Sequence, residues 1–217
     1  MKNMLCISGL IFSCLIILGC EGQETQTNFD FGRIEDNIYT NAFFNMKMTL
    51  PTDWVVQSEQ ETEEVMEEGR KLIAGNDKNL ESVIKASEVN TANLFMIYEY
   101  ELGSAVDYNP SLLLIAENLR NAPGIRTGAD YLFHARKFLA HAEVQYDHID
   151  EEFGEVDISG VPFHLMNTNI NYLGNDIKQR YYSTVLHGFS LNMIITYVDD
   201  EQRAELEKSI NSLTFEL

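Results

Sequence analysis

The side chains of this chain best suited to acid–base chemistry or metal binding are its histidines, namely His134, His141, His148, His164 and His187. His134 and His141 lie on one predicted helix, two turns or about 10 Å apart along its axis. Two ligands of one zinc ion, with bonds of about 2.0–2.1 Å, do not span that distance. The His-Glu-x-x-His spacing that suits such an ion is absent from the sequence. We therefore expect both histidines to flank the apolar face of their helix, with no metal site.

Two acidic segments are the other candidates for metal binding. The first contains Asp147, Asp150, Glu151, Glu152, Glu155 and Asp157. It lacks the alternating ligands and the central glycine of an EF-hand loop, which leaves weak calcium binding near Asp150 as an alternative only. The second, from Glu59 to Glu68, covers the first turns of a predicted helix, where carboxylates interact favourably with the helix dipole. We expect a solvated helix face there, and no metal in the protein.

Motifs of nucleophilic catalysis and of nucleotide binding are missing from the sequence. Residues 188–192 read Gly-Phe-Ser-Leu-Asn, which fails the Gly-x-Ser-x-Gly pattern, and there is neither a P-loop nor a Gly-x-Gly-x-x-Gly. Five tyrosines have the chemistry to line a ligand cleft, although core packing explains them more economically: Tyr98, Tyr100, Tyr172, Tyr181 and Tyr182. The sequence thus predicts no catalytic residue, no cofactor and no enzyme. The alternative is a hydrolase whose histidine and carboxylate meet only in the folded chain.

The start of the chain has the features of an export signal. Lys2 is followed by an uncharged apolar run at 4–18, which is shorter than the about 20 residues of a membrane-spanning helix. The run ends in Ile17-Leu18-Gly19-Cys20, which resembles a bacterial lipobox. The resemblance implies that the chain is cleaved after Gly19 and that Cys20 carries the lipid. An ordinary signal peptide with a chance cysteine at its end is the alternative.

This interpretation divides the chain into a signal peptide at 1–19, a lipidated cysteine with a flexible tether at 20–36, and a single domain at 37–217. The tether begins with polar residues that show no apolar period, and no later linker or repeat follows. The other two cysteines, Cys6 and Cys14, lie within the signal, so the domain contains no thiol and no disulfide. Its hydrophobic core alone must hold it together.

The net charge of the chain limits the classes of partner that it can bind. It has 15 Lys and Arg residues against 34 Asp and Glu residues, a formal net charge of -19 and a pI near 4.5. Nucleic acid is excluded, because binding to phosphates needs a basic footprint. Anionic lipid headgroups also repel such a domain, so we expect the acyl chains on Cys20 to hold it at the membrane. With 45% apolar residues, the chain has too much core-forming material for a disordered acidic tail.

The elements that position these side chains begin with a predicted strand hairpin. Its second strand is indicated by four apolar residues that alternate with polar ones: Phe44, Met46, Met48 and Leu50. Ser58 and Glu61 fit a capping box that opens a helix ending near Gly75. The predicted elements that follow are a short helix at 77–86, a strand buried on both faces at 94–100, and helices at 109–121 and 128–142.

From residue 153 onward the sequence favours strands. Four runs alternate in polarity and are separated by short turns that contain glycine, at 153–158, 161–172, 177–186 and 189–198. Consecutive strands joined in this way form an antiparallel meander. A helix capped by Asp199 and a short strand at 213–215 complete the predicted elements. We therefore predict an α+β fold, with an antiparallel β-sheet flanked by helices.

Two short segments resemble the PsbP-like superfamily, which includes the DcrB-type bacterial lipoproteins. The first is Leu50-Pro51-Thr52-Asp53-Trp54, after a strand hairpin and before a helix. The second is Ile194-Ile195-Thr196-Tyr197-Val198-Asp199-Asp200-Glu201-Gln202, with the helix and strand that follow. The resemblance spans roughly 37–217 and implies a small accessory or binding protein without a shared catalytic motif.

Together these features predict a membrane-anchored lipoprotein on the extracytoplasmic face of a bacterial cell envelope. We expect its domain to be a non-enzymatic accessory module that binds an envelope protein partner or a small ligand. The alternatives are the hydrolase described above and a weak metal-binding module at the acidic segment around Asp150.

Overall fold

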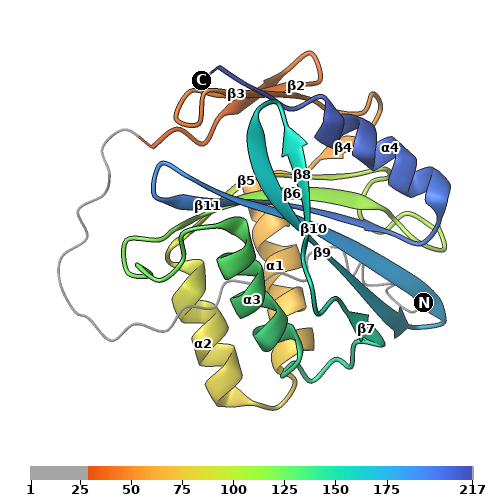
Figure 1. Cartoon of the computed structure of the whole chain (residues 1–217). Helices are drawn as coiled ribbons and strands as arrows, with labels where there is room; N and C mark the ends of the chain where they lie inside the picture. The colour runs from red at the N-terminus through yellow and green to blue at the C-terminus, as the bar shows by residue number, and fades with distance from the viewer. Residues whose placement is uncertain (1–28, 217) are drawn as a thin grey trace.

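The centre of the molecule is a twisted antiparallel sheet with a further layer on each face (Figure 1). The computed structural model describes residues 29–216. Within those residues eight strands form this sheet, in the order β4-β5-β6-β11-β10-β9-β7, with β8 paired to β9. The strands are β4 (Val55–Val56), β5 (Thr91–Tyr98), β6 (Ser111–Asn118), β7 (His148–Ile149), β8 (Gly154–Ile158), β9 (Val161–Tyr172), β10 (Asn175–Leu186) and β11 (Phe189–Tyr197).

The second half of the chain forms the predicted meander. β8, β9, β10 and β11 follow one another and pair in that order, always antiparallel. Two-residue turns join them at 159–160, 173–174 and 187–188, and both residues of each turn have φ between 51° and 87°. Such turns match the twist of the strands that they connect, and the second residue of each is the glycine that this backbone favours. The α+β fold class is therefore confirmed.

Three helices of the described chain cover one face of the large sheet: α1 (Glu59–Ala74), α2 (Lys78–Glu88) and α3 (Gly128–Leu139). The predicted capping box opens α1. The Ser58 N–H donates to the Glu61 carboxylate at 2.8 Å, and the Glu61 N–H donates to Ser58 Oγ at 3.2 Å. Thr127 and Asp130 make the same arrangement at α3, where a hydrogen bond from the Arg126 N–H is the main cause of a lowered pKa of Asp130.

A small sheet and a fourth helix cover the other face. In the described residues the small sheet has the order β1-β2-β3-β12 and consists of β1 (Arg33–Glu35), β2 (Ile38–Asn41), β3 (Met46–Thr49) and β12 (Thr214–Phe215). Beside it lies α4 (Asp200–Asn211), capped by Asp199 as predicted. The four alternating residues of the predicted strand are all buried in this second core: Phe44, Met46, Met48 and Leu50. The large sheet is thus covered on both faces.

The helix predicted at 109–121 is wrong, because this segment contains β6. The sequence of β6, Ser-Leu-Leu-Leu-Ile-Ala-Glu-Asn, is rich in good helix formers. The strand nevertheless pairs with β5 on one side and with β11 on the other, and residues 111–117 are all buried. A continuous apolar run suits a strand that is covered on both faces, and this tertiary context outweighs helix propensity.

The folded part begins earlier than the predicted boundary at residue 37. The ring of Phe29 lies 5.0 Å from the rings of Phe43 and Phe189, and β1 pairs with β2. Residues 29–36, which the sequence assigns to the tether at 20–36, therefore belong to the domain. The signal peptide at 1–19 and the lipidated Cys20 lie outside the described residues. Within residues 29–216, every helix is too short or too polar to cross a bilayer.

The first residue of α3 must be glycine for this helix to reach the sheet. A Cβ atom on Gly128 would overlap the carbonyl oxygen of Ser183 on β10 and would lie 3.2 Å from Nδ1 of His164 on β9. One turn later, the Tyr131 hydroxyl donates to the buried carboxylate of Glu117 at 3.0 Å. The close approach at Gly128 thus positions α3 over the interior of the sheet.

We expect Gly128→Ala to destabilise the domain by about 1–3 kcal/mol, because α3 or β10 must move to relieve the overlap. The measurement is the free energy of unfolding in urea. Gly124→Ala is the control, since a Cβ atom at Gly124 meets nothing within 4 Å. Its free energy of unfolding should change by less than about 0.5 kcal/mol, and equal stability of the two variants would contradict the close approach.

Candidate functional site

A cleft opens between α1, α2 and the first half of β5, on the helix-covered side of the large sheet. Its volume is about 530 Å³. It is lined by α1 side chains from Gln60 to Arg70, by Lys85 and Glu88 of α2, and by Thr91 and Asn93 of β5. The two helices form its walls because the chain reverses at 75–77, where Gly75 ends α1 with a φ of 51° and Asp77 caps α2.

An ion pair ties the two helical walls together. Arg70 Nη1 donates to both carboxylate oxygens of Glu88, at 2.9 and 2.7 Å. The Arg70 side chain is 10% exposed and the Glu88 side chain 29%, so the pair is largely removed from water. A carboxylate in this position needs its partner, since an uncompensated charge is costly when it is buried. The pair therefore bridges α1 and α2 at the cleft.

The rim of the cleft carries charges of both signs above a partly apolar floor. Glu63, Glu64 and Glu67 lie on the α1 wall, Lys85 lies on the α2 wall, and Met66 is buried beneath them. The pKa of Glu67 is lowered, chiefly by its hydrogen bond from Lys71 outside the cleft. The lining residues of the described cleft include no histidine, serine or cysteine. This arrangement suits the binding of a polar or charged ligand.

The histidines are distributed around the domain and none of the five lines this cleft. His134 is partly buried on α3. His141 is exposed and lies beyond Leu139, where this helix ends, so the expectation that both histidines flank the apolar face of one helix is wrong for His141. Two of the others lie beside carboxylates: His148 Nε2 is 2.8 Å from Asp150 Oδ1, and His164 Nε2 is 3.6 Å from Glu155 Oε2. His187 Nδ1 lies 3.0 Å from the Phe43 carbonyl oxygen.

Asp150 is held by the backbone and side chains of its neighbours. Its Oδ2 accepts hydrogen bonds from the Asn167 backbone and side-chain amides, both at 2.7 Å. The Asn167 Oδ1 in turn accepts from Arg180 Nε at 2.8 Å, and Arg180 pairs with Glu207 of α4. These contacts link β7, β9, β10 and α4, which gives the acidic segment a structural role. Within residues 29–216, no group of three His, Cys, Asp or Glu side chains has a geometry that could hold a metal ion.

The second acidic segment contributes Glu63, Glu64 and Glu67 to the cleft, whereas none of the five tyrosines lines it. The glutamates from Glu59 to Glu68 are exposed on α1, as predicted. Tyr98 and Tyr181 are buried in the core on the helix side of the large sheet, and Tyr182 is buried in the opposite core. Tyr100 is 41% exposed and its hydroxyl donates to Glu99. Tyr172 is partly buried against the same core as Tyr98 and Tyr181, so the sheet separates only Tyr182 from these three tyrosines.

Sequence reasoning did not single out Arg70, Glu88 or the buried Glu117. Arg70 and Glu88 are 18 residues apart on different helices, so no local spacing reveals them. The only local indication was Arg70 itself, a basic residue on the predicted helix that otherwise carries mainly glutamates. Glu117 was missed because β6 was predicted as a helix, which hides the alternation that places this carboxylate beneath α3.

Comparison with known proteins gives structural likenesses at low identity. No protein-family model and no curated protein matches the chain. PsbP of Synechocystis is 9% identical over 91% of this chain and 98% of that one, with a TM-score of 0.48. LpqN of Mycobacterium tuberculosis, described as involved in cell envelope biogenesis, is 13% identical over 78% of this chain and 82% of that one, with a TM-score of 0.43.

A protein from Bacteroides thetaiotaomicron is 11% identical over 80% of this chain, with a TM-score of 0.43. The matched region is only 46% of that longer chain. These likenesses assign no activity, ligand or partner to the present protein. Its α+β class follows from its own strands and helices.

We expect Arg70→Met to lower the free energy of unfolding by about 1–3 kcal/mol, because it leaves the Glu88 carboxylate without its partner. The control is Lys71→Met on the next residue. Lys71 pairs with Glu67 and Glu68 through side chains that are about half exposed, and such exposed pairs contribute little to stability. Urea unfolding measures both variants, and an equal loss in the two would contradict the special role of the Arg70–Glu88 pair.

A second prediction concerns the pH dependence of stability. Partial burial opposes ionisation of Asp150, but hydrogen bonds from Asn167 and His148 outweigh it and lower the pKa of Asp150 below its usual 3.8. Its contribution is therefore fully present above about pH 4–5 and is lost as the pH falls through the lowered pKa. Asp150→Asn should cost about 1–2 kcal/mol at pH 7 and progressively less toward pH 2 in urea unfolding. A constant difference across that range would contradict the assignment.

Proposed function

We propose that this chain is a lipid-anchored protein of a bacterial cell envelope whose domain binds a small polar ligand, or a polar segment of an envelope protein, in the cleft between α1 and α2. We propose further that it has no catalytic activity of its own. The observation that carries the binding role is the cleft itself, about 530 Å³ in volume, with charged walls held at a defined distance by the Arg70–Glu88 pair.

The geometry of the cleft supports binding by charge and hydrogen bonding. Its walls offer carboxylates at Glu63, Glu64 and Glu67 and an ammonium group at Lys85, and β5 adds the amide of Asn93. Because the Arg70–Glu88 pair orients both helices before a ligand arrives, little ordering is required on binding. Met66 adds a polarisable apolar surface for the non-polar part of a ligand.

The positions of the histidines support a non-enzymatic role over the hydrolase alternative. Acid–base catalysis needs a base within hydrogen-bond reach of a bound substrate. The His148–Asp150 pair lies at the end of β7 and the His164–Glu155 pair joins β9 to β8, and none of these four residues lines the cleft. Both oxygens of Asp150 are already engaged, by His148 and by Asn167.

The envelope location is supported by the lipobox-like segment Ile17-Leu18-Gly19-Cys20 and by the apolar run before it. Eight residues, 21–28, join Cys20 to the first described residue, Phe29. Three acyl chains on one cysteine would give an effectively permanent attachment, whereas one chain holds only marginally.

We expect Cys20→Ala to abolish lipid attachment in a bacterial host. The wild-type protein should incorporate labelled palmitate and enter the detergent phase of a Triton X-114 partition, whereas the variant should do neither. Cys14→Ala is the matched control, because it removes a thiol from the apolar run without touching the lipidated position. Mass spectrometry of the wild-type protein that finds residue 20 without acyl groups would overturn the envelope assignment.

The binding role is tested by a thermal-shift screen of small polar compounds and peptides against the protein. A ligand at 100 times its dissociation constant should add about 2.7 kcal/mol to the stability. Glu63→Lys on the cleft wall should change the affinity of a charged hit by about tenfold, weakening the binding of a cation and strengthening that of an anion. Glu205→Lys on α4 is the charge-matched control. A hit that is insensitive to Glu63→Lys and to Lys85→Glu would place binding outside this cleft.

A further inference from the structure

The two ends of the large sheet differ in the side chains that they expose. One end is formed by the loop at 119–127, the turns at 89–90 and 187–188, and the start of the described chain. Backbone hydrogen bonds of 2.9 Å join these segments, from Leu119 N to Gly188 O and from Asn118 N to Asn90 O. Phe29 packs on Phe189 at the same place. We call this the proximal end and define it by Phe31, Val89, Arg120, Arg126 and His187.

The proximal end combines exposed apolar side chains with arginines. Phe31 is 58% exposed and Val89 is 74% exposed. Arg120 and Arg126 are exposed on the loop at 119–127, which contains no carboxylate, although the Asp130 carboxylate at the start of α3 lies close to Arg126. The nearby Asp30 is occupied, since its side chain accepts from the N–H groups of Gly32 and Ala42.

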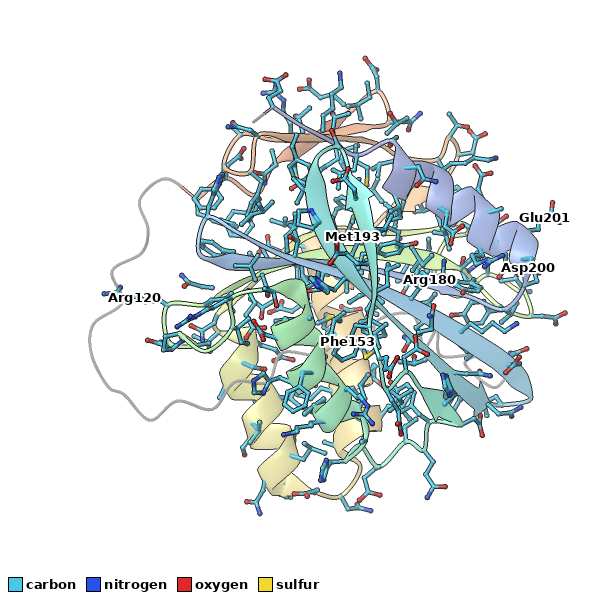
Figure 2. The ribbon with its side chains drawn as sticks, in the orientation of Figure 1. Arg120, Phe153, Arg180, Met193, Asp200 and Glu201 are labelled. Carbon is cyan, nitrogen blue, oxygen red and sulfur yellow. The ribbon has the colours of Figure 1, made fainter. Side chains whose placement is uncertain are left out.

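The opposite end of the sheet is acidic. Pairing of Ser111 with both Tyr98 and Thr196 brings the connection after β5 and the connection after β11 together there. These connections, the first turn of α4 and the β9–β10 hairpin carry seven carboxylates: Glu99, Glu101, Asp107, Asp176, Asp199, Asp200 and Glu201. Figure 2 shows the separation, with Arg120 at one end of the molecule and Asp200 and Glu201 at the other. The net charge of -19 is therefore unevenly distributed.

The length of chain before the domain brings the proximal end close to the membrane. Residues 21–28 join Cys20 to Phe29, and eight residues span at most about 26–29 Å when fully extended. Phe29 is itself part of the proximal end, where its ring lies 5.1 Å from that of Phe31. A lipid on Cys20 would thus hold this end, and not the acidic end, next to the bilayer.

We infer that the proximal end rests on the surface of an anionic bilayer, with Phe31 and Val89 among the headgroups and with Arg120 and Arg126 near the lipid phosphates. This inference depends on the proposed lipid anchor. The acyl chains supply the affinity, and the surface sets the orientation. Arginines are attracted to anionic lipids, while the acidic end is repelled and points away from the membrane. The α1–α2 cleft is then presented at a defined angle to the bilayer.

The experiment measures which end of the acylated, full-length mature protein meets the lipid. The chain has one tryptophan, Trp54, which precedes β4 and lies near the acidic end because Val55 pairs with Tyr98. Phe31→Trp places a second tryptophan at the proximal end. Both proteins are reconstituted into vesicles of phosphatidylglycerol and brominated phosphatidylcholine, and quenching of tryptophan fluorescence by the bromine atoms is recorded.

We expect the Phe31→Trp protein to be quenched at least about twofold more than its parent. Adding Arg120→Glu and Arg126→Glu should remove most of this excess, and 0.5 M salt should reduce it, since both weaken the attraction to anionic lipid. Arg203→Glu with Lys208→Glu on α4 is the charge-matched control and should keep the excess. Thermal unfolding verifies that all variants are folded.

Two outcomes would overturn the inference. One is an acylated protein in which Phe31→Trp is quenched no more than Trp54, which would mean that the domain is held off the bilayer or rests on another face. The other is quenching that is unchanged by the arginine substitutions or equal in purely zwitterionic vesicles. A surface that binds an acidic partner protein instead would give the first outcome. Failure of the lipid anchor itself is distinguished by mass spectrometry, since Cys20 would then lack acyl groups.

Discussion

The structure depends on the burial of one sheet on both of its faces. β6 and β11 are covered by helices on one side and by the small sheet and α4 on the other, and nearly every residue of both strands is buried. The described domain contains no cysteine, so no disulfide supplements this core. Removal of apolar surface from water must therefore provide most of the driving force for folding, and both covering layers are required.

The helical layer on one face of the sheet contains the candidate binding site. α1 and α2 contact the sheet mainly at β5, and the cleft lies between the two helices and this strand. Arg70 and Glu88 form a largely buried ion pair in the lining of the cleft. This pair connects the geometry of the cleft to the packing of both helices. The charged groups along the walls of this cleft suit the binding of a polar or charged ligand.

The connections between strands make the two ends of the domain different in charge. The loops at one end of the sheet carry arginines and exposed apolar side chains, and those at the other end carry carboxylates. Loops tolerate changes of sequence that the core does not. The charges on these loops can therefore differ between the two ends without disturbing the fold. A lipid anchor attached near the proximal end would hold this end at the membrane. Repulsion between the anionic membrane and the acidic end would then orient the domain.

The sequence by itself determined the elements whose signals are local. The capping box at Ser58, the cap at Asp199 and the turn glycines of the meander are recognised by their neighbours along the chain, because the hydrogen bonds and dihedral angles involved span only a few residues. Charge, the cysteine count and the lipobox-like segment are likewise visible without a structure. Tertiary structure decided the rest. The segment 111–118 became a strand because two neighbouring strands and two covering layers bury it, and Phe29 joined the domain through rings that lie far along the chain. Arg70 and Glu88 met only because two helices pack side by side, since long-range burial and pairing leave no trace in local spacing.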